Sequence, residues 1–346
     1  MPALTEFALI ARYFTRPCAE RQGVGDDCAL IDAGGQTLAL TSDMLLEGVH
    51  FLPGADPRKL GHKALAVNLS DLAAAGARPR AFLLDLALPR ADAHWLAGFS
   101  AGLFELAQAQ GCALIGGDTT RTPAARQQDG PIVIAITALG EVPAGRWRGR
   151  GGARPGDDIW VSGRLGEAAL GLALRRLERG EPGLLPADFD ARAGGAAAQA
   201  DWQQCRERMD RPEPRVALGL ALGGLASAAI DVSDGLVGDL GHILERSAVG
   251  ARLSWLAVPC APLFDRLPQA LRAQCVLAGG DDYELVFTAP APLRAQVAAL
   301  ATPELPLTRI GAIAAQPGLH FDDGEATLAG TTLQSFDHFR APADGA

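Results

Sequence analysis

The feature that most constrains the fold of this 346-residue chain is a series of six short acidic motifs, each with a glycine or a hydroxyl residue beside the acid. Most of them directly precede or follow a segment whose apolar and β-branched residues predict a strand. Proteins that alternate strands and helices place their ligands at strand ends. The series therefore predicts functional loops at strand ends in an α/β or α+β fold. The motifs are GDD (25–27), TSD (41–43), NLSD (68–71), GGDTT (116–120), DVSDG (231–235) and GGDD (279–282).

Predicted strands and helices alternate in both halves of the chain, which supports this fold class. Asp92 is predicted to cap a helix that ends at Gly111, because aspartate is favoured at helix N-termini and glycine just past C-termini. A segment rich in Gly, Arg and Pro, at 145–157, predicts a junction between domains 1–148 and 149–346. Other predicted helices are 60–75, 165–179, 216–226, 236–246 and 293–300, and the strands are 37–40, 81–88, 112–115, 132–139, 158–162, 228–232, 252–256 and 285–288.

The composition excludes several classes of protein. With 48% hydrophobic and 21% charged residues, the chain has the balance of a globular protein. The net charge of −9 argues against a dedicated binder of nucleic acid or anionic membranes, because both attract basic surfaces. No run of 18 apolar residues predicts a membrane-spanning helix, and residues 1–14 lack the apolar core of a signal peptide, so we expect a cytoplasmic protein.

Two scarce residue types exclude further kinds of site. Lysine occurs only at Lys59 and Lys63, and neither follows a glycine, so the chain has no Gly-Lys-Ser/Thr phosphate loop. The six cysteines are scattered and form no Cys-x-x-Cys pair, which argues against a disulfide framework and against a structural zinc site. Any phosphate-binding site must therefore be built from other groups.

The acidic motifs have a structural and a functional interpretation. An aspartate beside glycine is commonly a turn residue or a helix N-cap, and Asp71, within an apolar helical pattern, could lie on a solvated face. Turns, however, do not need the hydroxyl residues found beside these acids. Oxygen-rich sets suit hard cations such as Mg²⁺. Two carboxylates about 5 Å apart repel by roughly 3 kcal/mol at an effective dielectric constant of about 20, so a converging set predicts bound divalent cations.

Mg²⁺ often shares its coordination shell with phosphate oxygens, and the glycine pairs at 116–117 and 279–280 allow the backbone to approach a phosphate closely. The pattern thus favours a nucleotide bound through Mg²⁺. A calcium-binding EF-hand is disfavoured, because the chain lacks its D-x-[DN]-x-[DN]-G loop. A non-catalytic sensor of Mg²⁺ and nucleotide, regulating a partner, fits the same residues as an enzyme does.

Six longer motifs point to a known family: FALIARYF (7–14), GDDCAL (25–30), KALAVNLSDLAA (63–74), GGDTTR (116–121), DVSDGL (231–236) and DYEL (282–285). In these motifs the sequence resembles the thiamine-monophosphate kinases, in the superfamily of aminoimidazole ribonucleotide synthetase and selenophosphate synthetase. The resemblance covers nearly the whole chain, and the stretch NLSDLAA (68–74) and the tail FDHF (336–339) point to the kinase. The resemblance implies a two-domain fold like that of aminoimidazole ribonucleotide synthetase, with an N-terminal domain that pairs its strands across a dimer.

The resemblance implies phosphorylation of thiamine monophosphate by ATP, with several Mg²⁺ ions. It implies contacts to ATP from Gly117, Asp118, Arg150 and Ser233, and contacts to thiamine monophosphate from His50, Asp281 and Phe336. The family more usually has glutamate in place of Asp281 and often tyrosine in place of Phe336. The implied metal ligands are Asp27, Thr41, Ser42, Asp43, Asp71, Asp118, Asp231 and Asp234.

The implied acceptor is a phosphate monoester, which is mostly ionised near neutral pH, so no general base is expected. This agrees with the absence of an obvious Ser-His-Asp arrangement in the sequence. Two other members of the superfamily are alternatives: an enzyme that forms an acyl-phosphate-like intermediate, and one that phosphorylates selenide. The selenide enzyme would need a reactive cysteine with a nearby lysine, and Cys18 has no such lysine.

Overall fold

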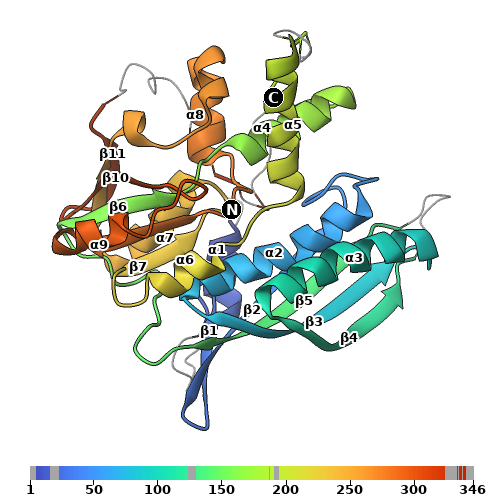
Figure 1. Cartoon of the computed structure of the whole chain (residues 1–346), viewed down its shortest axis with the longest axis horizontal. Helices are drawn as coiled ribbons and strands as arrows, with labels where there is room; N and C mark the ends of the chain where they lie inside the picture. The colour runs from blue at the N-terminus through green and yellow to red at the C-terminus, as the bar shows by residue number, and fades with distance from the viewer. Residues whose placement is uncertain are drawn as a thin grey trace. The chain divides into compact units, whose positions relative to one another are not determined.

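The computed structural model describes residues 5–15, 23–123, 130–186, 188–190 and 195–323, together with residues 333, 335, 336, 338 and 339; Cys18 lies outside them. The chain forms two compact units (Figure 1). Each contains its own mixed sheet and helices, so the predicted α/β or α+β fold is confirmed. No helix in the described ranges is both long enough and apolar enough to cross a membrane. The N-terminal unit comprises Glu20–Arg148 and Asp210–Gly224, and the C-terminal unit comprises Met1–Ala19, Gly149–Met209 and Leu225–Ala346.

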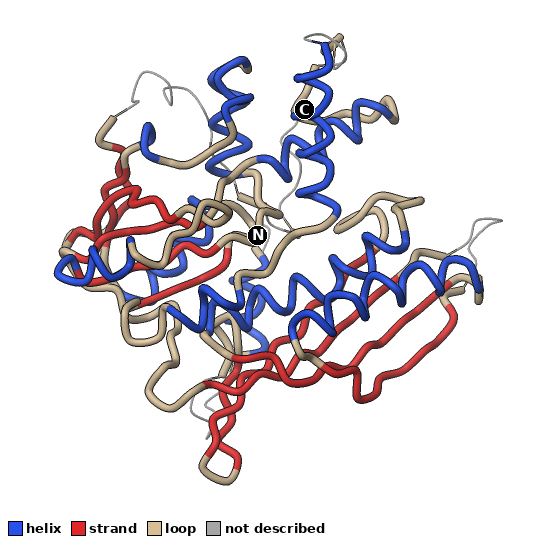
Figure 2. Tube along the Cα trace, in the orientation of Figure 1, coloured by secondary structure: helices blue, strands red, loops and turns tan. Residues whose placement is uncertain are grey.

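The N-terminal unit is built on a five-stranded sheet in the order β1-β2-β5-β3-β4. Strands β3 and β4 are parallel, and the other neighbouring pairs are antiparallel. Helices α2 and α3 lie side by side on one face of this sheet, as Figure 2 shows, and the short helix α6 packs against α2. The elements are β1 (Ala29–Ala33), β2 (Gln36–Leu46), α2 (Pro57–Ala75), β3 (Arg78–Leu88), α3 (Ala93–Gln110), β4 (Ala113–Arg121), β5 (Val133–Val142) and α6 (Val216–Ala221).

Local sequence signals set the ends of both long helices. The Asp56 side chain accepts a hydrogen bond from the backbone N–H of Lys59 at the start of α2, and Gly76, with φ of 70°, ends the helix. Asp92 accepts hydrogen bonds from two backbone N–H groups at the start of α3, and Gly111, with φ of 63°, ends it. The predicted helix from Asp92 to Gly111 is therefore confirmed.

The two helices approach each other closely at glycines. A Cβ atom at Gly61 would lie 2.0 Å from the Phe99 carbonyl oxygen, and one at Gly102 would lie 1.8 Å from the Arg58 carbonyl oxygen. Along β5, beneath the helices, buried residues alternate with half-buried ones, as expected for a sheet covered on one face. This packing holds α2, which carries the NLSD motif, directly against the sheet.

Strands β2 and β4 are longer than predicted, which places two acidic motifs inside strands instead of in loops. The predicted strand 37–40 extends to Leu46, and the predicted strand 112–115 extends to Arg121. Strand β2 stays in register with β5 over its whole length beyond the first residue, and β4 follows β3 to the same end. Backbone pairing therefore outweighs the local preference of Ser, Asp and Gly for turns.

The C-terminal unit is built on a six-stranded sheet in the order β11-β8-β10-β6-β9-β7. Strand β11 is parallel to β8, and the other pairs are antiparallel. Residues of α4, α7 and α8 share one apolar core with the sheet. The elements are α1 (Glu6–Leu9), a π-helical turn (Ile10–Phe14), β6 (Asp157–Ser162), α4 (Glu167–Glu178), α5 (Gly195–Asp210, whose last residue belongs to the N-terminal unit), β7 (Ala228–Asp231), α7 (Leu236–Ser247), β8 (Gly250–Leu253), α8 (Gln269–Ala278), β9 (Leu285–Pro290), α9 (Arg294–Ala298), β10 (Leu307–Ala314), β11 (Gly318–Phe321) and 3₁₀ turns at Trp255–Ala257, Pro262–Arg266 and Ala291–Leu293.

Candidate functional site

Acidic and hydroxyl side chains gather in the N-terminal unit where β2 faces α2. The hydroxyl of Thr41 donates a hydrogen bond to the Asp71 carboxylate. A carboxylate oxygen of Asp27 and one of Asp71 lie within 4.8 Å of each other. Asp43 follows Thr41 by two residues, on the same face of the strand. These four residues, all predicted as metal ligands, are called the acidic cluster below.

The acids of the cluster repel one another. The pKa of Asp43 is raised to about 6, first by burial, which disfavours the charged form, and second by the neighbouring Asp27. The pKa of the buried Cys28 thiol is raised well above its usual value, first by burial and then by Asp71 and other nearby acids. A set of carboxylate and hydroxyl oxygens in such a field fits a hard divalent cation such as Mg²⁺.

Asn68 of the NLSD motif forms hydrogen bonds to both elements beside the acidic cluster, α2 and β2. Asn68 lies three residues before Asp71 and therefore on the same side of α2. Its Nδ2 donates to the Ala64 carbonyl oxygen at 3.2 Å, and its Oδ1 accepts from the backbone N–H of Asp43 at 3.3 Å. Asn68 thus ties the strand to the helix at the position of the acids.

Ser42 does not share the face of its neighbours. Its hydroxyl lies 3.0 Å from the Thr137 hydroxyl oxygen on β5, within hydrogen-bonding distance. Because side chains alternate along a strand, this places the Ser42 hydroxyl on the face opposite Thr41 and Asp43. The metal role predicted for Ser42 stays a prediction, and in this arrangement it would fall to the backbone oxygen.

Gly117 and Asp118 lie on β4, at the edge of the sheet away from β1 and β2. Three strand spacings separate β4 from β2, about 14 Å in an ordinary sheet. A Cβ atom at Gly117, where φ is 140°, would lie 1.9 Å from the Leu84 carbonyl oxygen, so only glycine fits. Asp118 does not join the acidic cluster of its own N-terminal unit, and its predicted roles stay predictions.

His50 lies in the loop that follows β2. Its Nδ1 accepts a hydrogen bond from the backbone N–H of Leu46 at 3.0 Å, and its own backbone N–H donates to the Leu46 carbonyl oxygen at 3.0 Å. The side chain therefore closes the end of the strand. The predicted contact of His50 with the substrate stays a prediction.

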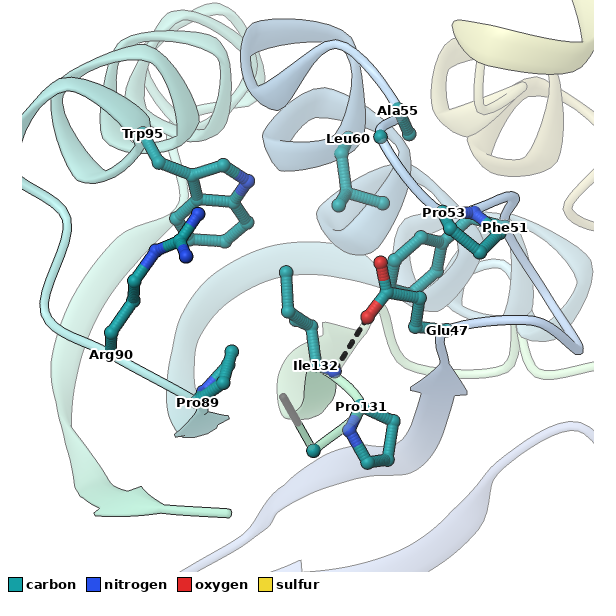
Figure 3. Close-up of a pocket in the computed structure, with 12 residues that line it drawn as sticks. Glu47, Phe51, Pro53, Ala55, Leu60, Pro89, Arg90, Trp95, Pro131 and Ile132 are labelled. Carbon is teal, nitrogen blue, oxygen red and sulfur yellow. Dashed lines mark hydrogen bonds between the residues drawn. The ribbon is translucent and has the colours of Figure 1, made fainter. Parts of the chain in front are cut away.

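A cavity of about 560 Å³ lies beside this loop (Figure 3). It is lined by aromatic and aliphatic side chains together with Glu47 and Arg90, and Glu47 Oε2 accepts a hydrogen bond from the Ile132 backbone N–H at 3.0 Å. Glu47 lies four residues beyond Asp43, and the residues that line the cavity include none of the predicted site residues. The cavity is therefore distinct from the acidic cluster.

Two loops meet in the C-terminal unit, one after β7 and one before β9. The backbone N–H of Asp281 donates to the Ser233 carbonyl oxygen at 2.8 Å, and that of Phe336 donates to the Asp234 carbonyl oxygen at 3.3 Å. Phe336 is 51% exposed, and its ring contacts the His338 ring edge-to-face with centroids 4.7 Å apart. Five predicted residues lie in or beside these loops: Asp231, Ser233, Asp234, Asp281 and Phe336.

Asp239 is a residue of this region that the sequence analysis did not single out. It is buried in the first turn of α7, and its Oδ2 accepts from the backbone N–H groups of Asp234 at 3.1 Å and Gly235 at 2.9 Å. Burial, followed by Asp234 and Asp231, raises its pKa well above the usual value. Asp239 thus fixes the turn that presents Asp234, and an acid four residues after a Ser-Asp-Gly turn was the available signal.

The arginines of the predicted junction differ in their surroundings. Arg148 is buried and donates to the Gly219 carbonyl oxygen, which attaches α6 to the rest of the N-terminal unit. Arg150 lies near His242, whose pKa is lowered to about 4 by burial first and by Arg150 second. Arg148 therefore has a structural role, and Arg150 remains the candidate for a phosphate contact.

The N-terminal unit identifies the class of protein. Residues 25–142 match a family model described as AIR synthase related protein, N-terminal domain. This segment contains the whole five-stranded sheet and the acidic cluster. The N-terminal unit therefore contains a domain of the AIR synthase-related class.

Matches over nearly the whole chain define the family. The chain is 43% identical to the thiamine-monophosphate kinase of Salmonella typhimurium, covering 98% of this chain and 100% of that protein. A crystal structure of the thiamine-monophosphate kinase from Stenotrophomonas maltophilia shares 45% identity with a TM-score of 0.73, covering 92% of this chain and 97% of that one. A structure of AaThiL complexed with AMPPCP and TMP shares 28% identity with a TM-score of 0.76 and 97% coverage of both chains. The chain belongs to the thiamine-monophosphate kinase family, as the resemblance predicted.

Proposed function

We propose that this protein transfers the γ-phosphoryl group of ATP to thiamine monophosphate, releasing thiamine diphosphate and ADP in the last step of thiamine diphosphate biosynthesis. The acidic cluster carries this proposal, because its oxygens suit Mg²⁺ bound to nucleotide phosphates. The names of the curated relatives support the acceptor. The AMPPCP and TMP in the AaThiL structure support both substrates.

Mg²⁺ would be held mainly by carboxylates. When bound, it would neutralise phosphate charge and stabilise the negative charge that spreads over the transferred group. The thiol of Cys28 is buried with a raised pKa, so the ligand set is one of oxygens, as Mg²⁺ requires. The proposed ligands are Asp27, Thr41, Asp43, Asp71, Asp118, Asp231 and Asp234, with Ser42 through its backbone.

The chain's own residues position the two substrates. The acceptor phosphate has a second pKa of about 6 and is mostly ionised at neutral pH, so no residue needs to remove a proton from it. Holding the acceptor oxygen in line with the γ-phosphorus supplies the rest of the catalysis, by direct transfer without a phosphoenzyme. In this proposal Gly117, Asp118, Arg150 and Ser233 contact ATP, and His50, Asp281 and Phe336 contact thiamine monophosphate.

We assign metal binding, ATP binding and dimerisation to domain 1–148. Domain 149–346 contributes the loops that follow β7 and precede β9. The proposed location is the cytoplasm, where ATP is available to the reaction.

The proposed homodimer forms through β4. This edge strand is exposed at every residue, with Ile115 65% and Leu114 37% exposed. A long apolar edge strand is a template for pairing with another chain. A second chain would also let Asp118 act beside an acidic cluster, because Asp118 lies three strands away from the cluster of its own unit.

Ile115→Lys is expected to weaken self-association at least about tenfold, because a charge would be buried where the strands pair. Sedimentation velocity over a dilution series measures the effect. Phe104→Lys, at an exposed aromatic residue of α3 in the same unit, is the matched control and should leave association unchanged. A wild-type protein that stays monomeric at micromolar concentration would contradict the proposed dimer.

A coupled assay for ADP tests the proposed function. We expect steady ADP release that requires both thiamine monophosphate and Mg²⁺, with little release when unphosphorylated thiamine replaces the acceptor. Binding of ATP without turnover would instead indicate a non-catalytic sensor of Mg²⁺ and nucleotide. Protein labelled covalently by γ-labelled ATP alone would contradict direct transfer.

A further inference from the structure

The loop between α8 and β9 has a left-handed backbone at two residues that are not glycine. The angle φ is 62° at Asp281 and 51° at Tyr283. Such conformations are uncommon for aspartate and more so for a bulky residue such as tyrosine. They persist only where the surrounding structure imposes them, and they cluster at functional sites.

The residue between these two, Asp282, is anchored inside the C-terminal unit. It is 3% exposed, and its two carboxylate oxygens lie 3.1 and 2.9 Å from the backbone N–H of Gly166, which donates to them. Gly166 caps the N-terminus of α4, where backbone N–H groups favour a carboxylate. One end of the anchor is therefore a helix that lies outside the loop.

Glu284 anchors the other side of the loop. It is fully buried; its Oε2 accepts from the Ser162 hydroxyl at 2.6 Å, and its Oε1 accepts from Arg208 Nη2 at 2.7 Å. Ser162 ends β6 and Arg208 lies on α5. The acids on either side of Tyr283 are thus held by three separate elements.

The strained residues make their hydrogen bonds to the loop that follows β7. The backbone N–H of Asp281 donates to the Ser233 carbonyl oxygen at 2.8 Å, and that of Tyr283 donates to the Val232 carbonyl oxygen at 2.9 Å. Anchored and strained residues alternate along this segment. The buried anchors therefore set the backbone conformation of the residues that adjoin the candidate site.

We propose that Asp282 is a positioning residue whose buried hydrogen bonds hold Asp281 in the left-handed conformation in which it contacts the acceptor substrate. This inference rests on the proposed function, which assigns Asp281 to thiamine monophosphate. Without the anchor, the backbone at Asp281 relaxes toward the right-handed region and its side chain leaves the acceptor. The loss then falls on acceptor binding, and not on ATP binding or on the chemical step.

Steady-state kinetics of Asp282→Ala, with each substrate varied in turn, test the inference. The KM for thiamine monophosphate is expected to rise about tenfold, while kcat and the KM for ATP stay within about twofold. Asp282→Asn keeps an oxygen for the Gly166 N–H and is expected to restore the acceptor KM to within about threefold of wild type.

Asp157→Ala is the matched control. Asp157 is also a buried acid of this unit, and its Oδ2 accepts from the Arg154 backbone N–H at 3.0 Å and the Ser227 hydroxyl at 2.6 Å. The Asp157→Ala protein should lose thermal stability without a change in its KM for thiamine monophosphate. An Asp282→Ala protein whose acceptor KM matches that of Asp157→Ala overturns the inference. If Asp282→Ala does not fold, Glu284→Gln takes its place: a raised acceptor KM supports the anchor, and an unchanged one overturns it.

Asp281→Ala separates this inference from the function on which it rests. If Asp281→Ala raises the acceptor KM and Asp282→Ala does not, positioning by Asp282 is overturned while the proposed contact of Asp281 with the substrate stands. An unchanged acceptor KM in Asp281→Ala removes the proposed substrate contact itself, and positioning with it.

Discussion

Asp71→Asn is expected to lower kcat at least about 100-fold at saturating Mg²⁺ while the protein still folds. The substitution removes a charge that lies within 4.8 Å of an Asp27 oxygen, so even a bound cation is held by less negative charge and is positioned differently against the phosphates. The amide oxygen can still accept the Thr41 hydroxyl, so the link between β2 and α2 survives. The ADP assay and thermal unfolding measure the two effects.

Asp32→Asn is the matched control for this substitution. Asp32 lies on β1 of the same sheet and also accepts a hydrogen bond from a threonine hydroxyl, that of Thr37 at 2.9 Å, but it is outside the acidic cluster. The Asp32→Asn protein should turn over at the wild-type rate. Near-wild-type turnover by Asp71→Asn at saturating Mg²⁺ would reject the role assigned to Asp71.

Removing divalent cations with a chelator is expected to abolish turnover and to leave a protein whose stability depends on pH. The pKa of Asp43 is about 6 in the folded protein, above its ordinary value of 3.8. A group whose pKa rises on folding contributes stability that is complete below the unfolded pKa and is lost as the pH rises through the folded value. The metal-free protein should therefore lose stability as the pH rises from about 4 to 6.

Mg²⁺ should reverse this loss, because it replaces the proton as the partner of the carboxylate. At about pH 5 only a tenth of Asp43 is ionised, so the apparent affinity for Mg²⁺ should be about tenfold weaker than near pH 7.5. Thermal unfolding with and without Mg²⁺ at the two pH values measures this difference. In Asp43→Asn the stabilisation by Mg²⁺ should no longer depend on pH over this range. Equal stabilisation by Mg²⁺ at both pH values would contradict the cation site.

The parts of the fold that depend on neighbouring residues were predictable from the sequence. Asp92 and Gly111 mark the ends of α3 because a side-chain cap and a left-handed glycine act within one helical turn. Asp71 was singled out for the hydroxyl beside it in the NLSD motif. In the structure it does accept a hydroxyl, but that of Thr41, which is thirty residues away in the sequence.

Positions that depend on pairing between distant segments were not predictable. The strand predicted at 37–40 continues to Leu46 because β5 pairs with it, and this pairing sends the hydroxyl of Ser42 away from Thr41 and Asp43. Asp239 was missed for a different reason: its contacts are local, to backbone N–H groups four and five residues earlier, and the sequence analysis did not treat an acid after the Ser-Asp-Gly turn as a partner of that turn.

The sequence by itself determined the chemical inventory: acids with hydroxyls and glycines beside them, no Gly-Lys phosphate loop, and an alternation of strands and helices that allows only mixed folds. Tertiary structure decided which acids are neighbours. Asp27, Thr41, Asp43 and Asp71 share one cluster, whereas Asp118 lies at the far edge of the same sheet. The reason is physical: composition and capping act over a few residues, whereas strand register and helix packing are set by contacts between segments tens of residues apart.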